Sequence, residues 1–151
     1  MSEFLDLHGR TSKALRALAD AAMRRHGLHV GQNYLLAVLW DRDGSTPGEV
    51  ATALNVTTPT VVKMADRMTA TGLLVRRRDD RDNRLVRLWL TDAGRALQKP
   101  VEAERQLIEE KVTADLTETE RKSLLNALAK VHRAASELLS EPIDHGDSAI
   151  T

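Results

Sequence analysis

A basic stretch in the middle of the chain carries most of the groups that could do chemistry. Between Thr57 and Arg95, nine lysines and arginines outnumber five acidic residues, whereas between Glu102 and Arg121 seven acidic residues outnumber three basic ones. Guanidinium and ammonium groups gathered in this way favour a polyanionic partner. The formal net charge of the whole chain is zero, so the distribution of charge, and not its total, indicates the partner.

Other kinds of chemistry lack the residues that they need. The chain contains no cysteine, which excludes a thiol nucleophile, a thiolate zinc site and a redox switch through sulfur. The five histidines show no His-x-x-x-His spacing, and His26 with His29 alone does not complete a metal site. P-loop, nucleophile-elbow and zincin motifs are also missing. We therefore expect a protein that is not an enzyme and that uses no cofactor and no metal.

The composition favours a mostly helical protein inside the cell. A length of 151 residues fits one domain, and the aromatic content of 3% is low while leucine and alanine are abundant, which favours packed helices. No apolar run reaches the roughly 18 residues that span a bilayer, and the first residues lack the pattern of a signal peptide. We expect a cytoplasmic location and no membrane contact.

Local signals predict two helices followed by a helix-turn-helix. Apolar residues at helical spacing indicate helices over about residues 3–25 and 30–40. Thr46 then opens a capping box that starts a short helix. Asn55 suits the left-handed turn that ends this helix, and we expect Val56 to plug the turn into the core. Thr57 caps a second helix, which stops before a glycine.

Two short apolar strands separated by a charged tip come next. The strands are expected at residues 73–78 and 85–90, with the tip at residues 79–83. This pattern predicts a small β wing of two or three strands. A helix capped by Thr91 follows, and we expect it to bend near Pro100.

The first and last helices are apolar along one face, yet both lie outside the central module. We expect the same helices of a second copy to cover them in a two-fold homodimer, the symmetry that a palindromic DNA site requires. Residues 1–141 are then a single chain with dimerisation helices at about residues 1–28 and 96–141 and a winged lobe at about residues 30–95. The polar tail, residues 142–151, is expected to be disordered.

The stretch from Glu49 to Gly94 resembles the core of the multiple-antibiotic-resistance regulator (MarR) family. Three segments carry the resemblance by their order and spacing: residues 49–61, Asp66-Arg67-Met68 with Gly72-Leu73-Leu74, and Asp82-Asn83-Arg84 with Leu90-Thr91-Asp92-Ala93-Gly94. Long helices on both sides complete the family's architecture. The resemblance implies a winged helix-turn-helix lobe, flanked by long N- and C-terminal dimerisation helices, in a regulator that binds double-stranded DNA.

The resemblance also implies which residues of the recognition helix contact the major groove. Hydroxyls in its first turn can donate to phosphate or base acceptors, and cations follow further along. The candidates are Thr57, Thr58, Thr60, Lys63 and Arg67. Two alternatives stay open: Thr57 is only a helix cap, or Arg67 pairs with Asp66. Val62, where the family often has a polar residue, either meets a thymine methyl or packs.

In the wing, the resemblance assigns Arg84 to the minor groove and Asp82 to the orientation of its guanidinium. A neighbouring carboxylate that fixes the guanidinium beforehand reduces the entropy lost on docking. Arg81 and Asn83 are the other tip candidates. The three arginines at 76–78 alternate across a strand, so they cannot all face DNA. The alternative for the arginine run is a solvated face.

Members of the family commonly release DNA when a small aromatic or phenolic ligand enters a crevice beside the winged lobe. The residues that this crevice could draw on are His8, Thr11, Ser12, His26, Tyr34 and Trp40. Alternatively, Tyr34 and Trp40 belong to the core. The prediction is thus a sequence-specific repressor that binds a pseudo-palindromic operator as a homodimer and is released by such an effector. A winged-helix protein-interaction module without specific DNA binding is the rival hypothesis.

Overall fold

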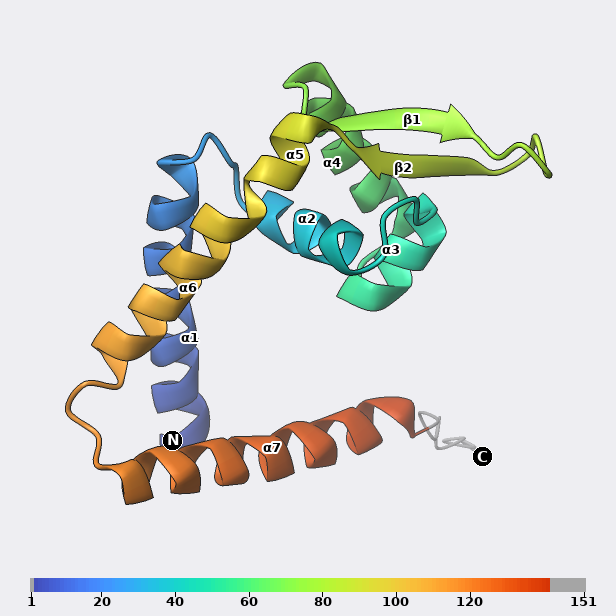
Figure 1. Ribbon diagram of the computed structural model, residues 1–151. Helices are drawn as coiled ribbons and strands as arrows, with labels where there is room; N and C mark the ends of the chain where they lie inside the picture. Colours follow the sequence, from blue (N-terminus) through green and yellow to red (C-terminus); the bar gives the residue numbers. More distant parts are fainter. Residues whose placement is uncertain (1, 142–151) are drawn as a thin grey trace, which may run out of the picture. The chain divides into compact units, whose positions relative to one another are not determined.

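The computed structural model describes residues 2–141, which contain seven helices and one two-stranded sheet (Figure 1). The chain separates into two compact units, residues 1–109 and 110–151, and the long helix of the second unit is α7. The tail predicted to be disordered, residues 142–151, lies outside the described residues. A mostly helical chain with a small β wing confirms the predicted fold class.

Helices α1 (Glu3–Arg24) and α2 (Gln32–Asp41) match the first two predicted helices. The turn between them places Gly27 and Gly31 at φ of +74° and +83°, a left-handed conformation that glycine adopts without a Cβ clash. Helix α2 packs against α3, α4 and β2. It supplies the centre of the core with three fully buried leucines, Leu35, Leu36 and Leu39.

Helices α3 (Pro47–Leu54) and α4 (Thr58–Ala70) form the predicted helix-turn-helix. The cap of α3 is confirmed, because Thr46 Oγ1 accepts the N–H of Glu49 at 3.2 Å. The predicted capping box is only half formed, because the Glu49 carboxylate accepts the hydroxyl of Thr46, at 3.2 Å, and not its backbone N–H. Asn55 adopts the expected left-handed conformation with φ of +54°. These local features fix where α3 begins and where it ends.

The turn between α3 and α4 is closed by the backbone and not by a buried side chain. Val56 donates its N–H to the carbonyl of Ala51 at 3.0 Å, as in a helix C-cap motif. Its side chain is 42% exposed, so the expectation that Val56 plugs the turn into the core is wrong. The two helices bury other residues instead, namely Val50, Ala51, Val61, Ala65 and Met68.

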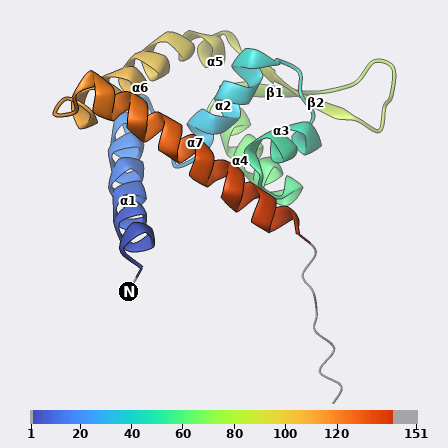
Figure 2. The same ribbon diagram turned by 90° about the horizontal axis from the view of Figure 1, so that it is seen from below.

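Strands β1 (Leu74–Arg78) and β2 (Val86–Leu90) form an antiparallel hairpin that extends beyond the helices as an arm (Figure 1, Figure 2). One face of its base is buried through Leu74, Leu88 and Leu90. The α2–α3 loop lies along β2, where Gly44 donates to the carbonyl of Leu88 and Leu88 donates to the carbonyl of Ser45, at 3.0 and 2.9 Å. The described residues contain no third strand.

Helices α5 (Asp92–Ala96) and α6 (Gln98–Val112) are the predicted bent helix. Thr91 caps α5 by accepting the N–H of Gly94 at 3.1 Å. The break falls at Leu97 because Pro100 cannot donate to the carbonyl four residues before it, and its ring crowds that carbonyl. The bend is therefore confirmed, a few residues ahead of the proline.

Helix α7 (Glu118–Ser140) begins with a full capping box. Thr117 Oγ1 accepts the N–H of Glu120 at 3.1 Å, and Glu120 Oε1 accepts the N–H of Thr117 at 3.0 Å. None of its residues is buried, and its exposed apolar side chains include Leu124, Leu128, Val131 and Leu138. Helix α1 separately exposes Phe4, Leu7, Leu15 and Leu18.

Candidate nucleic-acid interface

The first turn of α4 is held by two threonine hydroxyls. Thr57 Oγ1 accepts the N–H of Thr60 at 3.4 Å, and the two Oγ1 atoms lie 2.9 Å apart. Thr57 therefore caps the helix as predicted, and its contact with DNA stays a prediction. One hydroxyl hydrogen is used between the two side chains, so the pair keeps one O–H donor for another partner. Thr58 is exposed beside them.

The two cations of α4 are available for an external partner. Lys63 and Arg67 are exposed, and their side chains form no hydrogen bond or ion pair within the part of the chain that the structure describes. The alternative pair of Arg67 with Asp66 is wrong, because Asp66 pairs with Arg76 of β1. The Arg76 guanidinium also donates to the carbonyl of Val62 at 3.4 Å, which fastens β1 to α4.

The tip of the hairpin arm presents Arg84 to solvent. Its side chain is 91% exposed, and Asp82 Oδ1 accepts both its backbone N–H at 3.1 Å and its Nε–H at 3.2 Å. Asp82 thus restrains the guanidinium, as the sequence suggested. The contact of Arg84 with DNA stays a prediction, as do the roles of Arg81 and Asn83, which are exposed at the same tip.

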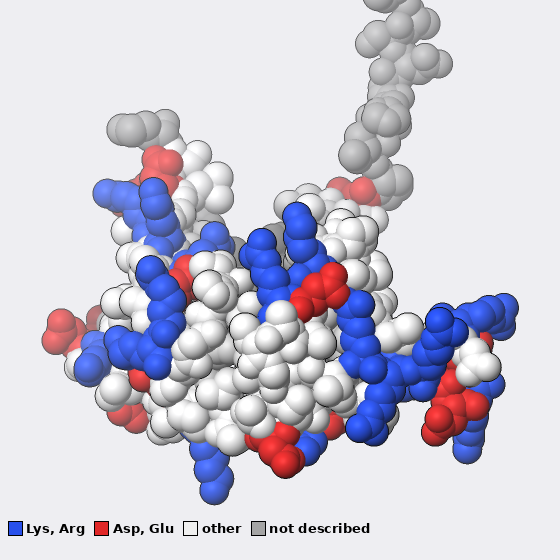
Figure 3. All heavy atoms as spheres, turned by 90° about the horizontal axis from the view of Figure 1, so that it is seen from above, with Lys and Arg blue, Asp and Glu red and all other residues white. Residues whose placement is uncertain are grey.

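Positive charge runs along the whole arm. Lys and Arg side chains gather at the right edge of Figure 3, where the arm projects, with a few acidic side chains among them. Arg77, Arg78 and Arg81 are exposed and have no ion pair among residues 2–141. Arg76 turns to α4, whereas Arg77 is paired across the hairpin with Arg87 on the other face, so the predicted alternation holds.

Sequence reasoning missed a contact at the base of the arm. Arg87 donates its Nε–H to Asp79 Oδ2 at 2.9 Å and an Nη1–H to the carbonyl of Gly44 at 3.0 Å. The pKa of Asp79 lies below its usual range because the Arg81 backbone N–H and the Arg87 guanidinium both favour the charged carboxylate. The sequence did contain a signal for this contact, because Asp79 and Arg87 are opposite charges eight residues apart across the predicted hairpin.

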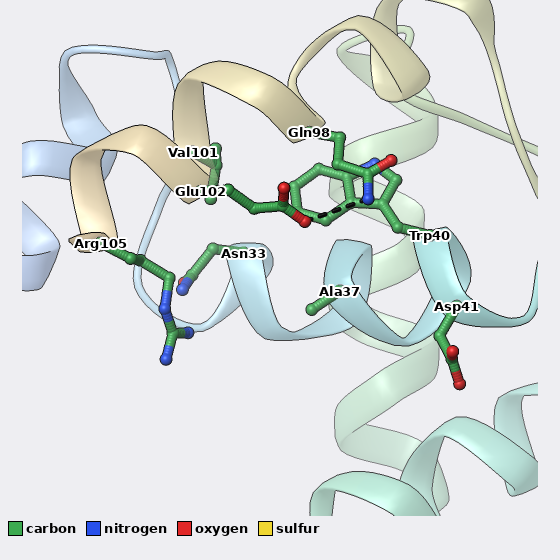
Figure 4. A pocket seen from close by; sticks show the side chains of 8 residues that line it. All are labelled: Asn33, Ala37, Trp40, Asp41, Gln98, Val101, Glu102 and Arg105. Carbon is green, nitrogen blue, oxygen red and sulfur yellow. Dashed lines mark hydrogen bonds between the residues drawn. The ribbon is translucent and has the colours of Figure 1, made fainter.

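A second surface feature is an open pocket of about 370 Å³ between α2 and α6 (Figure 4). Helix α2 contributes Asn33, Ala37, Trp40 and Asp41, and α6 contributes Gln98, Val101, Glu102 and Arg105. Trp40 donates its indole N–H to the carbonyl of Gly94 at 3.0 Å, which links the pocket to α5. The pocket combines an aromatic wall with polar and charged groups, as small-molecule sites do.

Of the residues predicted for a ligand crevice, Trp40 lines this pocket. Tyr34 is 48% exposed beneath the guanidinium of Arg105, 5.8 Å from its ring centre, so the alternative that Tyr34 is a core residue is wrong. His8 and Ser12 bond to each other on α1 at 3.3 Å. Their ligand roles stay predictions.

Another candidate for the crevice, His26, has a different partner. Its Nε2 lies 3.2 Å from Glu104 of α6, whose other carboxylate oxygen accepts a hydrogen bond from Arg25 at 3.1 Å. Arg25 and, to a smaller extent, His26 hold the pKa of Glu104 below its usual range. This contact ties the end of α1 to α6.

Residues 2–141 contain no cluster of three or more acidic, histidine or cysteine side chains that could hold a metal ion. No described helix is long and apolar enough to cross a membrane.

Comparisons with known proteins agree on one family. The MarR family profile matches residues 26–85. The chain is 30% identical to the regulator TtmR of Methylorubrum extorquens (strain PA1) over 72% of its own length, but spans only 55% of TtmR. It is 31% identical to the transcriptional repressor MdtR of Bacillus subtilis (strain 168), over 76% of this chain and 74% of MdtR.

Solved structures show the same fold. The crystal structure of the MarR family transcription regulator SP03579 superposes with a TM-score of 0.85 at 20% identity, and the match covers 93% of each chain. The match to MdtR carries the family assignment, and this superposition carries the fold. The chain therefore belongs to the MarR family of winged-helix transcriptional regulators.

Proposed function

We propose that the chain is a repressor that binds a pseudo-palindromic operator in double-stranded DNA as a homodimer. One observation carries this proposal: α4 and the hairpin arm, which belong to the same compact unit, both expose cationic side chains that form no ion pair with the described residues. These cations are Lys63 and Arg67 on the helix and Arg77, Arg78 and Arg81 on the arm. A recognition helix and an arm of this kind suit the major and minor grooves. The name of MdtR, a repressor, supports the direction of regulation. A cytoplasmic location belongs to the same proposal.

The homodimer is supported by the apolar rows on the terminal helices. Leucines and a valine recur along α7 at spacings of three, four and seven residues, and α1 exposes Phe4, Leu7 and Leu18. Exposed apolar side chains in such number are unfavourable in water and are covered when helices associate. A two-fold dimer also presents two recognition helices to a palindromic site.

Release by a small aromatic ligand is the third part of the proposal, and the α2–α6 pocket is its proposed site. Asn33 is 6% exposed and forms no side-chain hydrogen bond with residues that the structure describes, although it lines the pocket. No buried side-chain nitrogen or oxygen among the described residues lacks a hydrogen-bond partner, so the unpaired Asn33 amide is open to the pocket, where a polar group of a ligand can bond to it. Trp40 offers an aromatic wall for a planar ring, and Arg105 offers a cation for a phenolate or carboxylate.

The test is fluorescence anisotropy with duplex DNA from the region upstream of the gene itself, repeated at several salt concentrations with a scrambled duplex as competitor. We expect competitor-resistant binding with a log–log salt slope of about −6 to −10, because phosphate contacts release counterions. Salicylate, as a phenolic probe, is then added to the complex and is expected to dissociate it. Weak binding that does not depend on sequence would favour the rival hypothesis, a protein-interaction module.

A further inference from the structure

Arg87 of β2 is held on three sides. Its Nε and Nη2 atoms both lie 2.9 Å from Asp79 Oδ2, and its Nη1 donates to the carbonyl of Gly44 at 3.0 Å and lies 3.8 Å from Glu49 Oε1. The side chains of Arg87 and Asp79 are only 32% and 16% exposed, so water screens their contact less than it would at the surface. One guanidinium therefore joins the hairpin arm, the α2–α3 loop and α3.

Asp79 continues this connection toward the tip of the arm. Its Oδ1 accepts the N–H of Arg81 at 2.9 Å, and its own N–H donates to the carbonyl of Leu85 at 2.9 Å. Leu85 in turn donates its N–H to the carbonyl of Asp82 at 2.9 Å, and Asp82 accepts two hydrogen bonds from Arg84. A continuous set of hydrogen bonds thus runs from the base of the arm to its exposed guanidinium.

The other end of the connection is packed into the same body as α4. A Cβ added to Gly44 would lie 2.5 Å from the ring of Trp89, so the loop and β2 are in close contact there. The backbone of this loop also exchanges two hydrogen bonds with Leu88. Helix α3, which carries Glu49, packs against α4. The anchor of Arg87 is therefore part of the same packed body as the recognition helix.

We propose that Arg87 is a positioning residue for DNA binding, which fixes the arm and its tip residue Arg84 relative to the recognition helix α4. This rests on the proposed function. Its guanidinium is occupied by Asp79 and Gly44, so it acts through Arg84 and not by touching DNA. We call the contacts of Arg87 with Asp79 and Gly44 the clamp. An arm that is already ordered loses less conformational entropy when the complex forms, so the clamp raises the affinity for DNA.

Removing the carboxylate of Asp79 separates this role from a simple effect of charge. Asp79→Asn deletes a negative charge near a polyanion, and on electrostatics alone it strengthens binding. The clamp makes the opposite prediction, and we expect binding about tenfold weaker because a charged hydrogen-bond acceptor for Arg87 is lost. Asp80→Asn is the matched control. Asp80 is exposed, has no ion pair among the described residues, and carries the same charge one position further on.

A double-mutant cycle then tests whether Arg87 acts through Arg84. We expect Arg87→Gln to weaken binding about tenfold in the wild-type background but less than about twofold when Arg84 is already alanine, because coupled residues are not additive. An arginine that itself contacted phosphate would instead weaken binding equally in both backgrounds. Arg87→Lys, which keeps the charge but not the planar fork, is expected to restore only part of the affinity.

The measurements use the full chain and a duplex that the wild type selects from a randomised library, with anisotropy as the readout and matched unfolding midpoints as the check on folding. Weaker binding of Asp79→Asn with unchanged or tighter binding of Asp80→Asn supports the clamp. Equal tightening of both variants, or additive effects in the cycle, overturns it while leaving DNA binding in place. If the wild type selects no duplex, the proposed function fails, and the clamp fails with it. If Arg87→Gln does not fold, the two asparagine variants decide the question.

Discussion

Replacing Gly94 of α5 by alanine has two opposing effects on the stability of the fold. A Cβ built on this buried residue would lie 2.3 Å from the carbonyl oxygen of Leu73 and 3.2 Å from a methyl of Leu90. The Leu73 carbonyl is held by the N–H of Thr91 at 3.1 Å, and the Gly94 carbonyl by the indole of Trp40 at 3.0 Å. The backbone on both sides of the clash is therefore fixed.

The difference between the two effects decides whether Gly94→Ala raises or lowers the free energy of unfolding. Helix propensity favours alanine over glycine by about 0.5–1 kcal/mol. Overpacking a closed site costs about 1–3 kcal/mol, and we take the upper half of that range because the contact is with a hydrogen-bonded backbone atom. We therefore expect Gly94→Ala to lower the free energy of unfolding by roughly 1–2.5 kcal/mol.

Gly9→Ala is the matched control. Gly9 lies within α1 with nothing within 4 Å of an added Cβ, and at 100° per residue it is on the side of the helix opposite Leu18. The same change there should raise the free energy of unfolding by about 0.5–1 kcal/mol. Both variants are unfolded in urea at one protein concentration, followed by circular dichroism at the helical band, because the stability of a dimer depends on concentration. A Gly94→Ala protein as stable as Gly9→Ala would show that the close approach to Leu73 is not real.

Three further predictions concern the interface and the dimer. Arg84→Ala should weaken operator binding by about 1–3 kcal/mol in an anisotropy titration while the unfolding midpoint stays unchanged, and wild-type affinity would remove the minor-groove role of the arm. Because the folded-state pKa of Asp79 is lowered, its stabilising contribution is complete above the ordinary value of 3.8 and is lost as the pH falls through the folded value. The stability difference between wild type and Asp79→Asn should therefore shrink over that range, and a difference that is constant down to full protonation contradicts the contacts of the carboxylate with the Arg81 N–H and the Arg87 guanidinium. Truncation before Leu124 should give monomers or insoluble protein in light scattering, and a stable dimer would exclude α7 as the interface.

Much of the fold could be predicted because its signals are local. The caps at Thr46, Thr57 and Thr117 each depend on a hydroxyl and an N–H three residues later, so the sequence alone indicates where the helices begin. Asn55 ends α3 by its own tolerance of the left-handed region. The tip contact of Asp82 with Arg84 also spans only two residues, but its prediction came from the resemblance to the MarR family.

The misses concern contacts between residues distant in the sequence. Asp66 could be paired with its neighbour Arg67 from the sequence, but the hairpin brings Arg76 across to it. Arg87 bonds to Gly44, 43 residues away, and no periodicity indicates that contact. Tyr34 was weighed as a core residue by its spacing in α2, yet the approach of α6 places it beneath Arg105 at the surface. Which face of a helix is covered depends on the packing of other elements.

The paired hydroxyls of Thr57 and Thr60 limit how much sequence information the first turn of α4 can read. Three threonines stand there, but one hydroxyl hydrogen is consumed inside the pair, so the turn offers two O–H donors, one from the pair and one from Thr58. Two neutral donors can be satisfied by phosphates as well as by base edges. In the proposed complex, discrimination between operators then depends more on the width and deformability of the grooves, and the protein should tolerate a broad set of related sites that share one shape.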